Sequence, residues 1–399
     1  MRLFSSRGAS TLAALAAASV LAGCASNKAA EEAEAARIAQ ETAAQAILTK
    51  PVSLNDSVIQ SAAIYLGFTR DMATLRGGFE SPEAILAAMQ RGATYQPDQI
   101  SRGLVAYASV LALQSPEFVA GVRQFALDRA TRDQAVARIV ADPTYASTLP
   151  GADAAAGLIM GVLDADIAAL RTAADSIEND AYAIQADGRQ GWARQPVPDR
   201  EARIQSVKDL SGRTMLANAA DAARLASAAA SGSGLEVSAP RLRQPPYPPA
   251  VSSALALAAL AALDAAGENA IANTDALQYD RASQDCFASS KLNLYQCLAA
   301  SRPSYEVEFC LGRHVVRDLS TCARGTALPA GVITVDAPMQ SRVAAPSAAP
   351  TPSLAPPPPS VPRPTITPQS LPAPAAPPPA SPGTAASPTQ RLNAAPPAP

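Results

Sequence analysis

Proline is concentrated at one end of this 399-residue chain and limits how much of it can fold. The segment from Pro338 to Pro399 contains 21 of the 36 prolines, and most of its other residues are Ala, Ser and Thr. A segment with so few large apolar side chains cannot bury enough surface to offset the entropy of ordering. The composition therefore predicts a disordered, Pro/Ala-rich tail at 338–399 and confines the core to the residues before it.

The first two dozen residues have the pattern of an export signal. Arg2 and Arg7 form a short basic region before an apolar run at 11–22, which is shorter than the roughly 20 residues that a permanent membrane helix needs. The run ends in Leu21-Ala22-Gly23-Cys24. We therefore expect residues 1–23 to be removed as a signal peptide.

The sequence Leu21-Ala22-Gly23-Cys24 resembles the lipobox of bacterial lipoproteins. The resemblance implies that a diacylglycerol is attached to Cys24, that the chain is cut before it, and that acyl chains such as palmitate anchor the new N-terminus in a membrane. Residues 25–27 lack the aspartate that inner-membrane lipoproteins often carry next to the cysteine, which favours the outer membrane, facing the periplasm. The alternative is an ordinary secretory signal in which Cys24 is incidental.

Helical patterns cover the chain between the signal and the tail, so we predict an all-α, irregular multi-helix bundle. Residues 24–50 have good helix formers and little to bury, which predicts a lipid-anchored helical stalk. Residues 51–235 are expected to form a helical body, with helix starts at the capping residues Ser81, Ser115 and Thr131. One long helix is predicted by an apolar seam with steps of four and three. The seam consists of Leu163, Ile167, Leu170, Ala174, Ile177, Ala181 and Ile184.

The remaining segments are divided by glycine and proline. A loop is predicted at 187–199, and we expect the only tryptophan, Trp192, to pin it to the helices. The run 200–230 is expected to be one Ala-rich helix, followed by a Pro-rich linker at 236–250. The part at 251–330 is expected to contain a helix running from Ala250 toward Asp280 and a hairpin described below. A β-type alternation occurs only briefly, at 332–335.

With Cys24 lipidated, four cysteines remain within 37 residues. In an oxidising compartment this even set predicts two disulfides, for which three connectivities are possible. A turn at 302–304 predicts a helical hairpin at 281–324, in which Cys297 pairs with Cys310 and Cys286 with Cys322. The twelve-residue step from Cys310 to Cys322 leaves about a third of a turn of mismatch on a regular helix. The hairpin is similar in topology to CHCH-type hairpins, although its spacings differ from theirs.

A structural zinc site is the alternative for these cysteines, made by all four or by three of them with the single histidine, His314. Zinc-binding cysteines normally occur two to four residues apart, and the sequence contains no such pair. It also lacks the Cys-x-x-Cys motif of redox exchangers. We therefore predict structural cysteines, with no metal and no cofactor.

The sequence favours a non-catalytic protein. A formal net charge of −2 excludes a strongly basic nucleic-acid binder. Sequence motifs for phosphate binding, serine hydrolysis and zinc proteolysis are absent, so we predict no catalytic residue. We expect a scaffold or accessory subunit that binds an envelope protein or peptidoglycan. The alternatives are a peptidoglycan-active hydrolase, with Glu80 or Glu83 as its acid, and a carrier of small apolar ligands.

Overall fold

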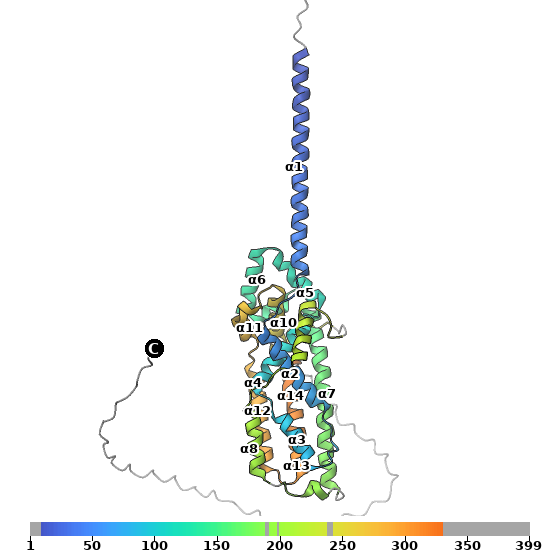
Figure 1. Cartoon of the computed structure of the whole chain (residues 1–399), viewed down its shortest axis with the longest axis vertical. Helices are drawn as coiled ribbons and strands as arrows, with labels where there is room; N and C mark the ends of the chain where they lie inside the picture. The colour runs from blue at the N-terminus through green and yellow to red at the C-terminus, as the bar shows by residue number, and fades with distance from the viewer. Residues whose placement is uncertain (1–8, 188–190, 198, 238–241, 330–399) are drawn as a thin grey trace, which may run out of the picture. The chain divides into compact units, whose positions relative to one another are not determined.

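The computed structural model describes residues 9–187, 191–197, 199–237 and 242–329, with side chains described from Lys28 onward except that of Ala29. Among these residues the prediction of an all-α fold is confirmed, since they contain one isolated β-bridge and no strand. The predicted tail at 338–399 and the alternation at 332–335 lie outside the described residues. The helices (Figure 1) are α1 (Ala9–Thr49), α2 (Asp56–Thr74), α3 (Pro82–Ala93), α4 (Pro97–Ala112), α5 (Pro116–Arg123), η1 (Gln124–Leu127), α6 (Arg129–Ala141), η2 (Pro143–Thr148), α7 (Ala152–Ala186), η3 (Gly191–Arg194), α8 (Arg200–Ser211), α9 (Ala219–Ser231), α10 (Pro249–Ala262), η4 (Glu268–Ala270), α11 (Ile271–Leu277), α12 (Arg281–Ala300), α13 (Ser304–Leu311), η5 (Gly312–Arg317) and α14 (Asp318–Ala327).

Helix α1 runs through both the predicted signal and the predicted stalk. Cys24 lies within this helix, and its side chain is outside the described part. Residues 30–43 are exposed, and Arg37 forms surface ion pairs with Glu34 and Glu41. At the other end Arg123 of α5 donates hydrogen bonds to the carbonyl oxygens of Leu48, at 2.6 Å, and of Lys50. Arg123 therefore caps the end of α1 and joins it to the helical body.

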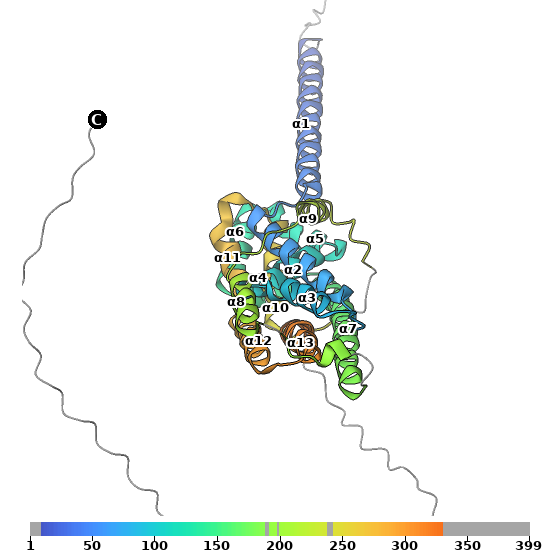
Figure 2. The ribbon, with the colours of Figure 1, turned by 60° about the horizontal axis from the view of Figure 1, so that its bottom comes forward.

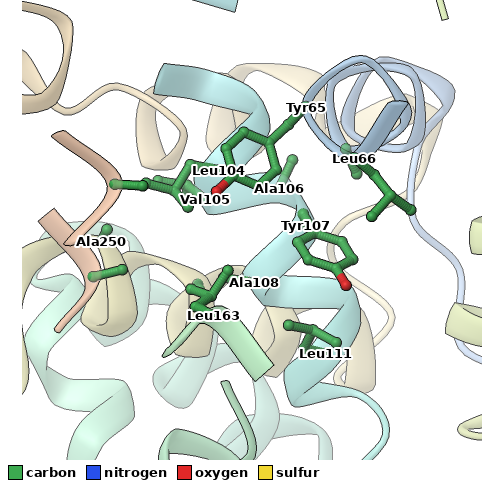
Figure 3. Close-up of a cluster of buried hydrophobic side chains, with 14 of the residues drawn as sticks. Tyr65, Leu66, Leu104, Val105, Ala106, Tyr107, Ala108, Leu111, Leu163 and Ala250 are labelled. Carbon is green, nitrogen blue, oxygen red and sulfur yellow. The ribbon is translucent and has the colours of Figure 1, made fainter. Parts of the chain in front are cut away.

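Two helices that are apolar on nearly every side form the centre of the body. Residues 103–112 of α4 and 254–262 of α10 are all buried. A helix with no polar face must be enclosed by other helices, and α2, α7, α10 and α12 pack around α4. Figure 3 shows this core, in which Tyr65 of α2, Leu163 of α7 and Ala250 of α10 surround α4. The segments 51–235 and 251–330 therefore share one core.

A close approach between α2 and α4 depends on Gly103. A Cβ atom at this position would lie 2.5 Å from the carbonyl oxygen of Ser61 and 2.6 Å from the Cβ atom of Tyr65. We expect Gly103→Ala to lower the free energy of unfolding by about 1–3 kcal/mol, because the two backbones would have to separate. Chemical denaturation measures this change. Gly325→Ala in α14 is the control, because its Cβ would meet open space and should raise stability by up to about 1 kcal/mol.

Several local sequence signals correctly predicted helix positions. The seven apolar seam residues all lie on α7, and all are buried. Ser81 and Ser115 cap α3 and α5 as expected, since each hydroxyl accepts a hydrogen bond from the backbone N–H three residues ahead. The expected start at Thr131 was wrong. The N-cap of α6 is Asp128, whose carboxylate accepts hydrogen bonds from both the backbone N–H and the hydroxyl of Thr131.

Two helices are shorter than the sequence predicted. The run 200–230 is divided into α8 and α9 by a loop at 212–218, and α9 begins at the capping residue Asn218. The helix expected from Ala250 toward Asp280 ends at Ala262, and Asp264 has a left-handed φ of 58°. Asp is one of the few residues that tolerate this conformation. The chain then continues through η4 and α11, so the apolar run 254–262 is a short buried helix.

The segment 281–324 forms the predicted hairpin, with α12 as its first arm and α13, η5 and α14 as its second. The two arms lie side by side (Figure 2). The sulfur atoms of Cys297 and Cys310 are 2.03 Å apart near the turn, and those of Cys286 and Cys322 are 1.99 Å apart at the open end. This is the nested arrangement that the hairpin topology predicts.

The second arm contains a π-helical segment that the sequence pattern did not predict. Segment η5 (Gly312–Arg317) lies between Cys310 and Cys322. A π-turn holds about one residue more than an α-turn, and one residue corresponds to about 100° of rotation. On a regular helix, the twelve-residue step from Cys310 to Cys322 overshoots by about a third of a turn. The π-helical segment offsets most of this rotation, so that both cysteines face α12.

Candidate functional site

A groove of about 390 Å³ opens between α3, α8 and α13. These helices gather at one end of the body, together with α12 (Figure 1). We call it the α3–α8–α13 groove. It is lined by Pro82, Glu83, Ile85, Leu86 and Gln90 of α3, by Val197 and Asp199 before α8, by Ala202, Arg203 and Ser206 of α8, and by Ser304 and Val307 of α13.

The walls of the groove are fixed by local interactions. The Ser81 hydroxyl and Pro82 set the start of α3. The segment before α8 is attached to the turn of the hairpin, because the backbone N–H of Val197 donates to the carbonyl oxygen of Arg302 at 2.7 Å. Pro196 and Pro303 form the isolated bridge beside this bond. Trp192 packs in a partly buried position against the core, as expected, and holds the same loop.

Arg203 is the unusual residue of the α3–α8–α13 groove. Arg203 is 6% exposed, and among the described residues its guanidinium makes one hydrogen bond, from Nη2 to the hydroxyl of Ser301 at 3.5 Å. The Nε and Nη1 atoms are buried and have no hydrogen-bond partner in the part of the chain that the structure describes. Burial, followed by the charge of Arg200, lowers the pKa of Arg203. A buried guanidinium with unused donors is destabilising, because it has lost hydration without a compensating acceptor.

A second unpaired group lies in the same groove. Ser304 is 2% exposed and is the first residue of α13, and no described residue forms a hydrogen bond with its hydroxyl. The N-terminus of α13 adds the positive end of the helix dipole. The buried polar lining of the groove is thus rich in donors, while the rest of its buried lining, Ile85 and Val307, is apolar.

The predicted acids of a hydrolase lie at solvent-exposed positions. Glu83 lines the groove and is exposed, and Glu80 is exposed and lies outside the groove lining. The other acid that lines the groove, Asp199, is exposed as well. The groove therefore brings Glu83 and Asp199 to one site, without a buried carboxylic acid among its lining residues.

Among the described residues, no three His, Cys, Asp or Glu side chains are grouped so that they could hold a metal ion. The zinc alternative is contradicted, because the four hairpin cysteines lie at disulfide distance in pairs. His314 faces Asp318, with its Nδ1 3.2 Å from a carboxylate oxygen. His314 therefore has a local partner on its own arm of the hairpin.

Two other buried ionisable side chains were missed by the sequence analysis. Lys291 donates from Nζ to the carbonyl oxygen of Ala93 at 2.7 Å and to the Ser211 hydroxyl at 3.1 Å, and it lies 3.5 Å from the centre of the Tyr95 ring. Lys291 is thus satisfied by its surroundings and ties α12 to α3 and α8. Glu308 of α13 is 0% exposed, and its carboxyl group lies beside that of Asp180.

Comparison with protein-family models, with curated proteins and with solved structures found no match. In the described part of the chain, no single helix is long and apolar enough to span a membrane, and α4 with α5 and η1 meets that test only as a pair bent by 84°.

Proposed function

We propose that this chain is an outer-membrane lipoprotein whose helical body is a non-catalytic binding subunit, which contacts an envelope protein or peptidoglycan in the periplasm. The anchor is supported by the lipobox-like sequence that ends at Cys24. The exposed part of α1 supports a spacer between that anchor and the body. From Cys24 to Thr49 this helix spans about 38 Å at 1.5 Å per residue.

The α3–α8–α13 groove is the observation that carries the binding role. Its volume of about 390 Å³ is in the range of ligand sites, and its lining mixes apolar side chains with a few polar groups. Hydrolysis of a glycan needs a carboxylic acid kept protonated by its surroundings. Glu83 and Asp199 are both exposed to solvent, which favours binding over hydrolysis.

Site-specific photocross-linking in intact cells tests the binding role. A photoreactive phenylalanine is placed at Leu86 or Ala202, which line the groove, and at Ala87, which is exposed on α3 outside it. We expect both groove positions to give the same envelope product and Ala87 to give none. Equal products from all three positions, or none from the groove, would contradict the proposal. Repeating the measurement on a chain truncated after Met339 shows whether the predicted tail contributes to recognition.

Loss of the anchor is the second test. We expect Cys24→Ser to abolish labelling by an alkyne analogue of palmitate and to move the protein from the membrane to the soluble periplasmic fraction, because serine offers no thioether for the lipid. Ser26→Ala, two residues away, should keep both the label and the membrane location. A Cys24→Ser protein that remained labelled in the outer membrane would show that the anchor lies elsewhere.

A further inference from the structure

The unpaired donors of Arg203 and Ser304 indicate what the α3–α8–α13 groove lacks. Arg203 and Ser304 both line this groove, and the Nε and Nη1 atoms of Arg203 and the hydroxyl of Ser304 are buried, with no hydrogen-bond partner among the described residues. A ligand that brings an acceptor oxygen to these donors would remove an unfavourable feature of the free protein. A ligand with a charged acceptor would gain the most binding free energy, because a guanidinium and a carboxylate form short, strong hydrogen bonds.

The rest of the lining restricts the body of the ligand. Apolar side chains, including Ile85, Leu86 and Val307, form about half of the lining and suit an apolar segment. The polar side chains of Gln90 and Ser206 lie along the same groove, where they can pair with amide groups. A plain hydrocarbon chain would use none of these groups, whereas the backbone of a peptide would. Polar partners along an apolar groove therefore favour a peptide over a fatty acid.

The exposed acids of the groove limit the charge of the ligand. Glu83 and Asp199 line the groove and are open to solvent. They repel a ligand with several negative charges, such as a nucleic acid or a phosphorylated headgroup. A single carboxylate that reaches the buried Arg203 is repelled less by Glu83 and Asp199, because water screens these two exposed side chains.

From these contacts we infer that the α3–α8–α13 groove binds the C-terminal carboxylate of an apolar peptide segment from another envelope protein, with Arg203 and Ser304 as the carboxylate donors. The inference rests on the proposed function, because it names the chemistry of the partner that the groove would recognise. Recognition by the groove then depends on a free C-terminus of the partner.

Fluorescence polarisation with the full mature chain in detergent tests this inference. The probe is a fluorescein-labelled peptide of sequence GSLALV, prepared as the free acid and as the C-terminal amide. We expect the acid to bind at least about tenfold more tightly than the amide, since the amide cannot form charged hydrogen bonds with Arg203. Equal affinity of acid and amide would overturn the inference.

Matched variants locate the effect. Arg203→Met should abolish the preference for the acid while keeping the fold, because it removes an unpaired buried charge. Lys208→Met removes a positive charge from an exposed position of the same helix and should keep the preference. Ser206→Phe fills the groove from α8 and should weaken both peptides, which keeps the test decisive if Arg203→Met fails to fold. A preference that survives in Arg203→Met would contradict the role of this residue.

Other occupants give distinct results. Decanoate that binds more tightly than the peptide and depends on Arg203 would identify a small amphiphile as the ligand and overturn the peptide assignment. Binding at least tenfold tighter to a chain truncated after Met339 would show that the groove holds the chain's own C-terminus, which would also overturn it. If no peptide binds while cross-links from Leu86 and Ala202 persist in cells, this inference fails and the proposed function stands.

Discussion

Replacing all four hairpin cysteines by alanine is expected to lower the free energy of unfolding by about 5–7 kcal/mol. The two bridges close loops with sequence separations of 36 and 13 residues. In the chain-entropy description these loops correspond to about 4 and 3 kcal/mol when each is taken alone. The nested arrangement lowers the sum somewhat, because the inner bridge already shortens the outer loop. This is a large share of the stability of a typical folded protein.

Denaturant unfolding of unlipidated protein that carries Cys24→Ala measures the change. The paired variants Cys286→Ala/Cys322→Ala and Cys297→Ala/Cys310→Ala should each lose part of the stability, the former more than the latter. Reductant should lower the stability of the parent protein to that of the four-alanine variant and should leave that variant unchanged. A parent protein that did not respond to reductant would show that the bridges are absent or contribute no stability.

Glu308→Gln is expected to stabilise the protein by up to about 3 kcal/mol at pH 7. Burial, followed by the neighbouring Asp180 carboxylate, raises the pKa of Glu308 from an ordinary 4.5 to about 9. The folded state therefore holds a proton that the unfolded state releases above pH 4.5. The stabilising contribution of this group is complete below about pH 4.5 and is lost as the pH rises toward 9, at about 1.4 kcal/mol per pH unit. Glutamine has the same shape as glutamic acid and no charge, so the variant does not lose stability in this way as the pH rises.

Thermal and denaturant unfolding between about pH 5 and pH 8 test the role of Glu308. The curves of parent and Glu308→Gln should converge at low pH and diverge as the pH rises. Glu201→Gln changes an exposed carboxylate on α8 and should follow the parent at every pH. Parallel curves for Glu308→Gln and parent would show that Glu308 keeps an ordinary pKa in the folded protein.

The sequence predicted the helical hairpin because its signals are local. The turn at 302–304 and four cysteines at nearly helical spacing define two arms and a nested pairing. The mismatch from Cys310 to Cys322 was also visible in the sequence. The π-helical segment that offsets this mismatch was not visible in the sequence, because it depends on the contacts of the second arm. Helix α7 packs along that arm, and Glu178 of α7 accepts a 2.5 Å hydrogen bond from Arg317 at the end of η5.

The division between α8 and α9 shows where local patterns fail. The sequence at 212–218 contains one glycine and good helix formers, so a continuous helix was expected. In the structure two glutamines bind this loop, Gln96 at the N-cap of α4 and Gln99 within that helix. Gln99 exchanges hydrogen bonds with the backbone N–H and carbonyl of Met215, and Gln96 donates to the carbonyl oxygens of Ser211 and Arg213. Such partners are distant in sequence and replace the hydrogen bonds that a helix would have made.

The candidate site was the least predictable part of the molecule. Glu83 was singled out from the sequence and does line the groove, whereas Arg203 and Ser304 were missed. Arg203 lies in an ordinary helical pattern and Ser304 in the predicted turn at 302–304, and arginine and serine are usually exposed at such positions. Burial of Arg203 results from packing between α8, α3 and the hairpin turn, elements that are about a hundred residues apart. A charged residue within a longer apolar stretch would have indicated a buried arginine. The apolar neighbours of Arg203 in Ala202-Arg203-Ile204 are too few to give this signal.

The disulfides, the anchor and the binding partner all depend on one claim, which is that the chain is exported and cleaved before Cys24. The intact mass of the protein purified from outer membranes without reductant tests this claim most directly. We expect a chain that begins at Cys24, carries a diacylglycerol and an additional acyl chain, and is lighter than its reduced form by the four hydrogens that two disulfides remove. An unlipidated mass, or a chain that retains residues 1–23, would contradict it.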